Sequence, residues 1–175
     1  ILAMTSPDRL ACLQDLERRV LWLASWTIHN ANHLREPDAV KVGGHQASSA
    51  SLVAIMTALY FAVLRPQDRV AVKPHASPVF HAIQYLAGQQ SRAKLEAFRS
   101  FKGAQSYPSR TKDVDDVDFS TGSVGLGVAQ TLFSALVQDY VSAHRWMKRP
   151  EGRMVALVGD AEMDEGNIYE ALIEG

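Results

Sequence analysis

The spacing of apolar residues along the chain predicts a series of helices interrupted by two short strands. From residue 8 to residue 34, Leu10, Leu13, Leu16, Val20 and Leu23 recur at helical spacing, with Asp8 as the expected N-cap. The same reasoning predicts helices over 47–64, 79–87, 92–98 and 124–147, and a last helix from Ile168 to Ile173. Continuous apolar runs predict buried strands over 69–72 and 154–158.

The second strand is followed by the stretch with the clearest candidate chemistry. Gly159 and Asp160 end the apolar run, an acidic segment reaches Glu165, and the last helix follows. In open parallel sheets, ligands bind beyond the carboxyl ends of the strands. There the Asp160 carboxylate can hold a hard cation such as Mg²⁺, and the helix N-terminus can hold an anion such as a diphosphate.

Two other interpretations of this stretch remain open at this point. A Gly-Asp pair after a strand is often only a turn with an Asx hydrogen bond, and for the stretch taken alone we favour that reading. A calcium loop is the other interpretation, because carboxylates alternate at Asp160, Glu162 and Asp164. That loop requires Gly at its sixth position and Glu at its twelfth, where this chain has Glu165 and Ala171.

Composition limits the class of protein. The 175 residues, 47% apolar and 21% charged, are typical of one soluble globular domain, and the net charge of −1 gives no indication of nucleic-acid binding. The lone Cys12 excludes an internal disulfide and fits a reducing compartment, so we expect a cytoplasmic protein. We expect no apolar run of membrane-spanning length. The chain begins with Ile and ends inside a predicted helix, so we expect a piece of a longer protein.

Three further loops carry candidate residues. They are Gly43-Gly44-His45, the His75 that follows the first strand, and the glycine-rich segment 120–127. Each taken alone is weak evidence, since glycine turns and structural histidines are common. The His29 and His33 pair near a helix end is interpreted as structural, and the acidic run over 113–118 is expected to be a solvated surface loop.

Taken together and in order, these segments resemble the transketolase family of thiamine-diphosphate enzymes over about residues 20–174. The stretch from Val155 to Asn167 resembles the family's cofactor motif, and its Gly-Asp-Ala-Glu-Met-Asp-Glu form is most similar to the homodimeric first enzyme of the pyruvate dehydrogenase complex. Lys73-Pro74-His75-Ala76-Ser77 resembles the Gly-His-Ala-Ser segment, and 120–127 resembles the glycine-rich segment. Ala161 stands where the family usually has Gly, and the motif's closing Asn is not within this chain.

The resemblance implies thiamine diphosphate and Mg²⁺ as cofactors, with Asp160 as the metal ligand. It implies cofactor binding by His75, Gly122, Val124, Gly159, Asp160, Ala161 and Glu162, with the Gly122 carbonyl on the cofactor's amino group and Val124 on its pyrimidine ring. It implies catalytic roles for His45, His75 and Glu165, the glutamate being a subunit-interface residue that communicates protons between sites. The glutamate that activates the pyrimidine belongs to a second domain, which is not present here.

We therefore predict an α/β fold with a doubly wound, mostly parallel sheet and helices on both faces, incomplete in this chain because only two strands are predicted. Residues 1–175 are expected to form the N-terminal part of the diphosphate-binding domain. We expect carbon–carbon bond chemistry next to a carbonyl, of the 2-oxo acid dehydrogenase type. Two alternatives remain: transketolase-type transfer between sugar phosphates, and a non-catalytic assembly fragment.

The segment Ser106-Tyr107-Pro108-Ser109 keeps the Ser-Tyr-Pro of the dehydrogenase enzymes, without the His-Pro that follows it there. The expected partners are a small-molecule substrate, either a 2-oxo acid or a ketose phosphate, and a second copy or partner subunit that carries the pyrimidine-binding domain. No nucleic acid or membrane partner is expected. The isolated piece is expected to be inactive and to self-associate.

Overall fold

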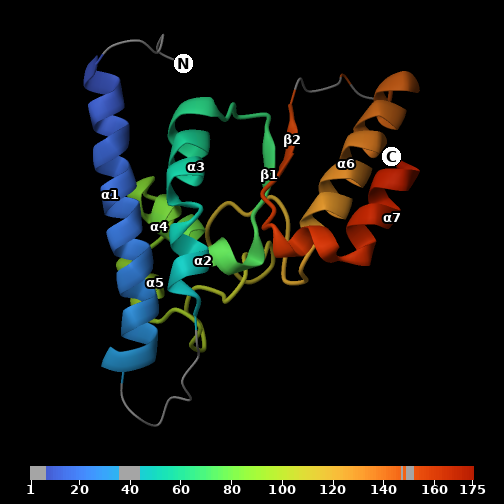
Figure 1. Ribbon diagram of the computed structural model, residues 1–175. Helices are drawn as coiled ribbons and strands as arrows, with labels where there is room; N and C mark the ends of the chain where they lie inside the picture. The colour runs from blue at the N-terminus through green and yellow to red at the C-terminus, as the bar shows by residue number, and fades with distance from the viewer. Residues whose placement is uncertain (1–6, 36–43, 147, 149–151) are drawn as a thin grey trace. The chain divides into compact units, whose positions relative to one another are not determined.

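The computed structural model describes residues 7–35, 44–146, 148 and 152–175, and the chain divides into two compact units (Figure 1). Unit 1 comprises Ile1–Leu64, His75–Ser106 and Lys112–Asp116, and unit 2 comprises Arg65–Pro74, Tyr107–Thr111 and Val117–Gly175. Each unit buries its own set of apolar side chains. Unit 1 buries Val20, Ile28, Met56, Phe80, Ile83, Leu95 and Phe98, and unit 2 buries Val70, Val72, Val117 and Ile168.

Unit 1 is built around helix α1 (Pro7–His29), which continues into the π-helical turn η1 (Asn30–Leu34). The helix predicted over 8–34 is therefore confirmed, but Asp8 lies inside its first turn, so the expectation that Asp8 is the N-cap is wrong. The apolar face of α1 buries Val20, Ala24 and Ile28, and the helix packs against α2, α3 and α4.

The apolar stretch predicted as one helix over 47–64 is interrupted. It consists of α2 (Gln46–Ala50), α3 (Val53–Ala58) and the π-helical turn η2 (Leu59–Val63). By length and composition alone the run Gln46–Val63 could cross a membrane, so the expectation that no run reaches that length is wrong. Its middle part packs as core helices do, because α3 contacts α1 and α4 and buries Val53 and Met56.

Two further helices complete unit 1. Helix α4 (Ser77–Leu86) follows the 3₁₀ turn η3 (Pro74–Ala76), and α5 (Arg92–Glu96) begins at Ser91, whose hydroxyl accepts the Lys94 backbone N–H. Gly88 has a φ of 78° and ends α4 in a Schellman motif, because its N–H donates to Tyr85 and the next N–H donates to Gln84. The helices predicted over 79–87 and 92–98 are confirmed with slightly different bounds.

The acidic run over 113–118 is more than a solvated loop, and that prediction is wrong for three of its carboxylates. Asp115 is buried in unit 1, and its Oδ2 lies 2.8 Å from Nδ1 of His81, which is fully buried. Asp113 accepts the Gln105 N–H at 3.0 Å, and in unit 2 Asp118 accepts the Val70 N–H at 2.8 Å. In a segment without regular structure, carboxylates supply the acceptors that a helix or sheet would otherwise provide.

Unit 2 contains a parallel pair of strands, β1 (Arg69–Ala71) and β2 (Met154–Ala156), as predicted (Figure 1). Arg69 pairs with Met154, Val70 with Val155 and Ala71 with Ala156. Helix α6 (Leu126–Ala143) packs against both strands and against α7 (Gly166–Glu174). The predicted α/β class is confirmed, and the described part of the chain contains two strands.

One buried carboxylate joins the starts of the two strands. Asp68 precedes β1, and its oxygens accept hydrogen bonds from the backbone N–H groups of Arg153 at 2.8 Å and Arg65 at 2.9 Å. The Arg153 guanidinium donates twice more, at 2.5 and 3.2 Å. These donors, the guanidinium first, hold the pKa of Asp68 well below its usual range.

Candidate functional site

In unit 1, the two histidines selected from the sequence lie together. The rings of His45 and His75 pack edge to face with centroids 5.4 Å apart. His45 is exposed and immediately precedes α2, while His75 is half-buried in the turn after β1. The buried Ser49 hydroxyl donates to the His75 carbonyl at 3.0 Å, which holds this turn against α2. Gly43, selected with His45, lies outside the described residues.

In unit 2, the segment after β2 forms a tight acidic turn. Asp160 leads into the 3₁₀ helix η4 (Ala161–Asp164), and Glu165 precedes the first residue of α7. Asp160, Ala161 and Glu165 are exposed. The Asp160 carboxylate makes no hydrogen bond or ion pair with the described residues. An exposed carboxylate at the carboxyl end of a parallel strand is therefore available to a metal ion.

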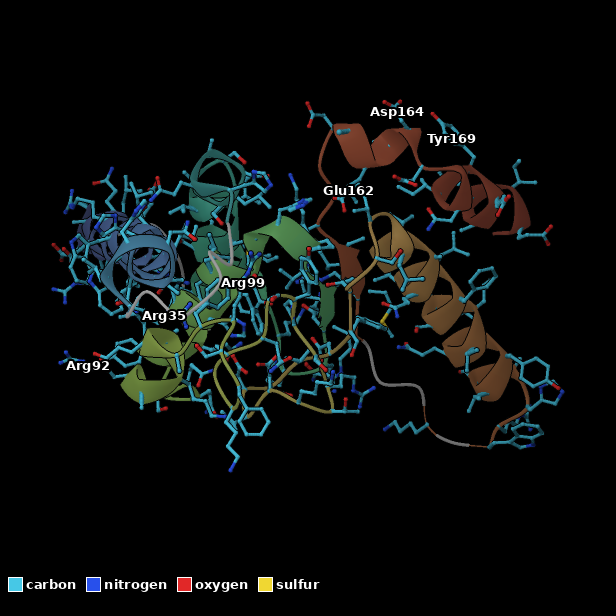
Figure 2. All side chains as sticks on the ribbon, turned by 90° about the horizontal axis from the view of Figure 1, so that it is seen from below. Arg35, Arg92, Arg99, Glu162, Asp164 and Tyr169 are labelled. Atoms are coloured by element: carbon cyan, nitrogen blue, oxygen red, sulfur yellow. The ribbon has the colours of Figure 1, made fainter. Side chains whose placement is uncertain are left out.

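Glu162 behaves differently from its acidic neighbours. Its side chain is only 4% exposed, and its Oε2 accepts the Gly159 N–H at 2.6 Å. Its Oε1 lies 3.5 Å from the Gly125 N–H. Figure 2 shows Glu162 pointing inward near the beginning of α6, whereas Asp164 and Tyr169 point outward. The carboxylate thus joins the Gly-Asp turn to the glycine-rich segment.

The glycine-rich segment is fixed at two points of unit 2. The buried Thr121 hydroxyl donates to the Val72 carbonyl at 2.5 Å, so the segment is tied to the end of β1. Gly125 has a φ of 77°, and a Cβ at this position would lie 2.5 Å from the Asn167 side chain. Only glycine adopts this left-handed φ at no steric cost and also leaves the space beside Asn167 free. Gly122 is exposed, so a ligand could reach it, and the role predicted for its carbonyl stays a prediction. Val124 is half-buried.

Lys73 is a residue of this region that the sequence analysis did not select. It follows β1 by two positions, and its ammonium lies against Gly159, because a Cβ built on Gly159 would be 2.5 Å from the lysine Nζ. The signal was present in the sequence as a cation at the end of a buried strand. In that segment the histidine two positions later is the residue that carries the family resemblance.

The structure therefore brings Gly159 and Glu162 together with Gly125 in unit 2, and His45 together with His75 in unit 1. A meeting of all these loops at one site stays a prediction. The residues of unit 2 fit a metal–diphosphate group: Asp160 offers an unengaged carboxylate, Lys73 offers a cation, and Gly159 lacks the side chain that would displace it.

Two other features of unit 1 are weaker site candidates. His81, Asp113 and Asp115 lie close enough to hold a metal ion, but both ring nitrogens of His81 are engaged, one by Asp115 and one by the Gln105 carbonyl at 3.0 Å. That arrangement is a structural hydrogen-bond network.

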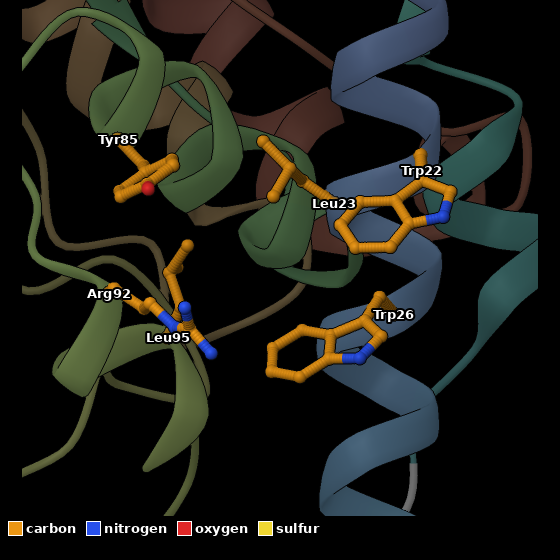
Figure 3. Close-up of a pocket in the computed structure, with 6 residues that line it drawn as sticks. All are labelled: Trp22, Leu23, Trp26, Tyr85, Arg92 and Leu95. Atoms are coloured by element: carbon orange, nitrogen blue, oxygen red, sulfur yellow. The ribbon is translucent and has the colours of Figure 1, made fainter.

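The second feature is a hollow of about 250 Å³ between α1 and the segment carrying α4 and α5 (Figure 3). Trp22 and Trp26 form one wall, with ring centroids 6.2 Å apart. Its charged lining residue, Arg92, is already paired with Glu96 at 2.7 Å. The hollow therefore lacks the converging polar groups typical of an active site.

Comparison with known proteins shows the family to which this chain belongs. A family model described as 1-deoxy-D-xylulose-5-phosphate synthase matches residues 31–174, which include every residue selected for the site. The chain belongs to the transketolase-like thiamine-diphosphate enzymes. The roles of the Gly159-Asp160 turn and of the glycine-rich segment in cofactor binding stay predictions.

The curated relatives of this transketolase-like chain include two bacterial pyruvate dehydrogenase E1 components. That of Mycolicibacterium smegmatis is 29% identical over 87% of this chain, and that of Pseudomonas aeruginosa is 32% identical over 86%. Transketolase-like protein 2 of Mus musculus is 29% identical over 97% of this chain. The chain spans 18% of the length of each E1 component and 26% of the mouse protein.

A solved structure shows the same fold. Transketolase from Campylobacter jejuni superposes with a TM-score of 0.71 at 23% identity, over 91% of this chain and 25% of the transketolase chain. The predicted fold class, incomplete in this chain, is thereby confirmed.

Proposed function

We propose that this chain forms the diphosphate-binding part of a thiamine-diphosphate- and Mg²⁺-dependent enzyme that acts on a carbon–carbon bond next to a carbonyl. The observation that supports this most directly is the exposed, unengaged Asp160 carboxylate directly after the parallel strand β2. Asp160 would hold Mg²⁺, while Glu162 keeps the turn in shape through the N–H groups of Gly159 and Gly125.

The bound cofactor would supply the nucleophilic thiazolium carbon and the electron sink, so the protein residues orient groups and move protons. The Gly122 carbonyl would accept from the cofactor's amino group, and Val124 would pack on its pyrimidine ring. His45 and His75, already in ring contact, would supply proton transfer or hydrogen bonds, because an imidazole nitrogen can donate or accept a proton. Glu165, exposed before α7, would act at a subunit interface.

Among reaction classes we place 2-oxo acid decarboxylation of the pyruvate dehydrogenase type first. The Glu162-to-Glu165 run and Ser106-Tyr107-Pro108 support it, as do the E1 relatives. Transketolase-type transfer of a two-carbon unit is the second candidate, supported by the mouse relative. A non-catalytic assembly role is the third.

The metal assignment is tested by Asp160→Ala in the full-length protein. We expect the variant to lose Mg²⁺-dependent binding of thiamine diphosphate in calorimetry, because the carboxylate is the metal ligand that this chain supplies. Asp164→Ala is the matched control, since Asp164 is an exposed carboxylate four residues away. Equal cofactor affinity in the Asp160 variant and the wild type would contradict the assignment.

The reaction class is tested by turnover. The full-length protein is offered pyruvate and other 2-oxo acids with an artificial electron acceptor, and separately a ketose phosphate with an aldose acceptor. Reduction of the acceptor with a 2-oxo acid supports our first choice. Ketose phosphate turnover without 2-oxo acid activity would reverse the order, and no turnover with intact cofactor binding would favour the assembly role.

A further inference from the structure

Lys73 occupies an unusual place in unit 2. It lies beyond the carboxyl end of β1, and because β1 and β2 are parallel and in register at Ala71 and Ala156, Lys73 and Gly159 leave the strands at the same edge. A Cβ built on Gly159 would be 2.5 Å from Nζ and 2.8 Å from Cε of the lysine. The end of the Lys73 side chain thus fills the space that the missing side chain of Gly159 leaves.

The ammonium of Lys73 is not used by the protein itself. Lys73 is half-buried and makes no hydrogen bond or ion pair with any residue that the structure describes. The Oε2 of Glu162 lies 3.5 Å from the same Cβ position, but it accepts the Gly159 N–H at 2.6 Å. The negative charge of Glu162 favours a cation at this place. Because the Glu162 Oε2 already accepts the Gly159 N–H, the three N–H donors of the Lys73 ammonium stay available to a ligand.

An ammonium with available donors at the edge of a sheet is suited to bind a phosphate group. A diphosphate held by Mg²⁺ and a single carboxylate such as Asp160 keeps a net negative charge, so a fixed cation beside it lowers the free energy of the complex. From this geometry we infer that Lys73 Nζ binds a phosphate oxygen of the diphosphate and so acts as a positioning residue of the cofactor site. The inference rests on the proposed function.

The test uses Lys73→Met in the full-length protein, because methionine keeps an apolar stem over Gly159 and removes only the charge. Binding is measured by calorimetry at fixed Mg²⁺ with thiamine diphosphate, and separately with inorganic pyrophosphate. We expect both ligands to bind about 10- to 100-fold more weakly to the variant, as for loss of one charged hydrogen bond. In kinetics, the KM for the cofactor rises while kcat at saturating cofactor stays near the wild-type value.

Two controls separate charge from folding. Lys112→Met makes the same substitution at an exposed position of unit 1 and should leave both affinities unchanged. Lys73→Arg keeps the charge and should restore part of the affinity for both ligands. If Lys73→Met lowers the melting temperature of the cofactor-free protein, the comparison of Lys73→Arg with Lys73→Gln decides instead, since both alter packing and only one keeps the charge.

The outcomes distinguish this inference from the function on which it rests. A wild-type protein that does not bind thiamine diphosphate with Mg²⁺ refutes the proposed function. A wild-type protein that binds it, with Lys73→Met binding within twofold, refutes the role of Lys73 and leaves the function intact. Weaker binding of thiamine diphosphate with unchanged pyrophosphate affinity also refutes the role, because the contact is then not with the diphosphate.

Discussion

Replacing Asp68 by Ala is expected to loosen the parallel strands of unit 2 more than any surface substitution. The Asp68 side chain is fully buried, and it accepts four hydrogen bonds, two from backbone N–H groups and two from the Arg153 guanidinium. A hydrogen bond to a charged group contributes about 1.5–3 kcal/mol. Arg153 is 45% exposed, so water can replace part of what its guanidinium loses.

The net cost is therefore about 2–4 kcal/mol of local stability, less than the sum of four bonds. The assay is hydrogen exchange followed by mass spectrometry on peptides that contain β1 and β2. The amides of Arg69 and Leu157, which donate to Arg153 and Ala71 at each end of the pair, are the reporters. With about 1.36 kcal/mol per tenfold change, we expect exchange about 30- to 900-fold faster.

Asp116→Ala is the matched control, since Asp116 is an exposed carboxylate in unit 1 and its loss should change stability by less than about 0.5 kcal/mol. Exchange in the Asp68 variant within threefold of the wild type would refute the reasoning. It would show that β1 and β2 are held by their ladder and by α6, without help from this carboxylate.

The pH dependence provides an independent check of the same carboxylate. Because the folded-state pKa of Asp68 is depressed, its contribution is fully present above the unfolded-state pKa of about 3.9 and is lost as the pH falls toward the folded-state value. Wild-type protection of β1 should therefore decrease below about pH 4. The Asp68→Ala protein, which lacks the group, should show a smaller decrease over the same range.

Three further predictions concern other parts of the molecule. Asp115→Ala should destabilise unit 1 by about 1–3 kcal/mol in urea titrations, because the buried His81 Nδ1 loses its partner; an unchanged midpoint would contradict this. Gly125→Ala should lower the melting temperature, since a left-handed φ costs about 1–2 kcal/mol and the new Cβ meets Asn167, whereas Gly166→Ala, with open space around it, is the control. The isolated chain should self-associate in light scattering, because exposed apolar side chains line α6 and α7, including Phe133, Val137, Tyr140, Leu172 and Ile173; a monodisperse monomer would refute this.

The sequence predicted well the elements whose signal is local. Apolar periodicity located α1, α4, α6 and both strands, and the Gly-Asp turn after β2 was expected where it lies. The break at Ser51–Leu52 was missed because the apolar pattern runs through it without a glycine or proline.

What the sequence did not reveal depends on partners distant along the chain. In the sequence, Asp115 is one of several acidic residues in a loop. Only the fold brings it beside His81, which lies 34 positions earlier in the chain. Glu162 was selected as part of a motif, but its engagement by Gly159 and Gly125 required the backbone geometry. Lys73 meets Gly159 only because two strands far apart in sequence are paired in parallel.

The separation of 85 residues between Asp68 and Arg153 has a consequence for folding during synthesis on the ribosome. At about 5–20 residues per second, a ribosome needs about 4–17 s to make the partner that β1 requires. During that interval the edge of β1 that will pair with β2 is unpaired. Residues 75–106 and 112–116 of unit 1 are synthesised in the same interval. Such an edge is a target for non-native pairing, so β1 is where we expect a nascent chain to depend on chaperones.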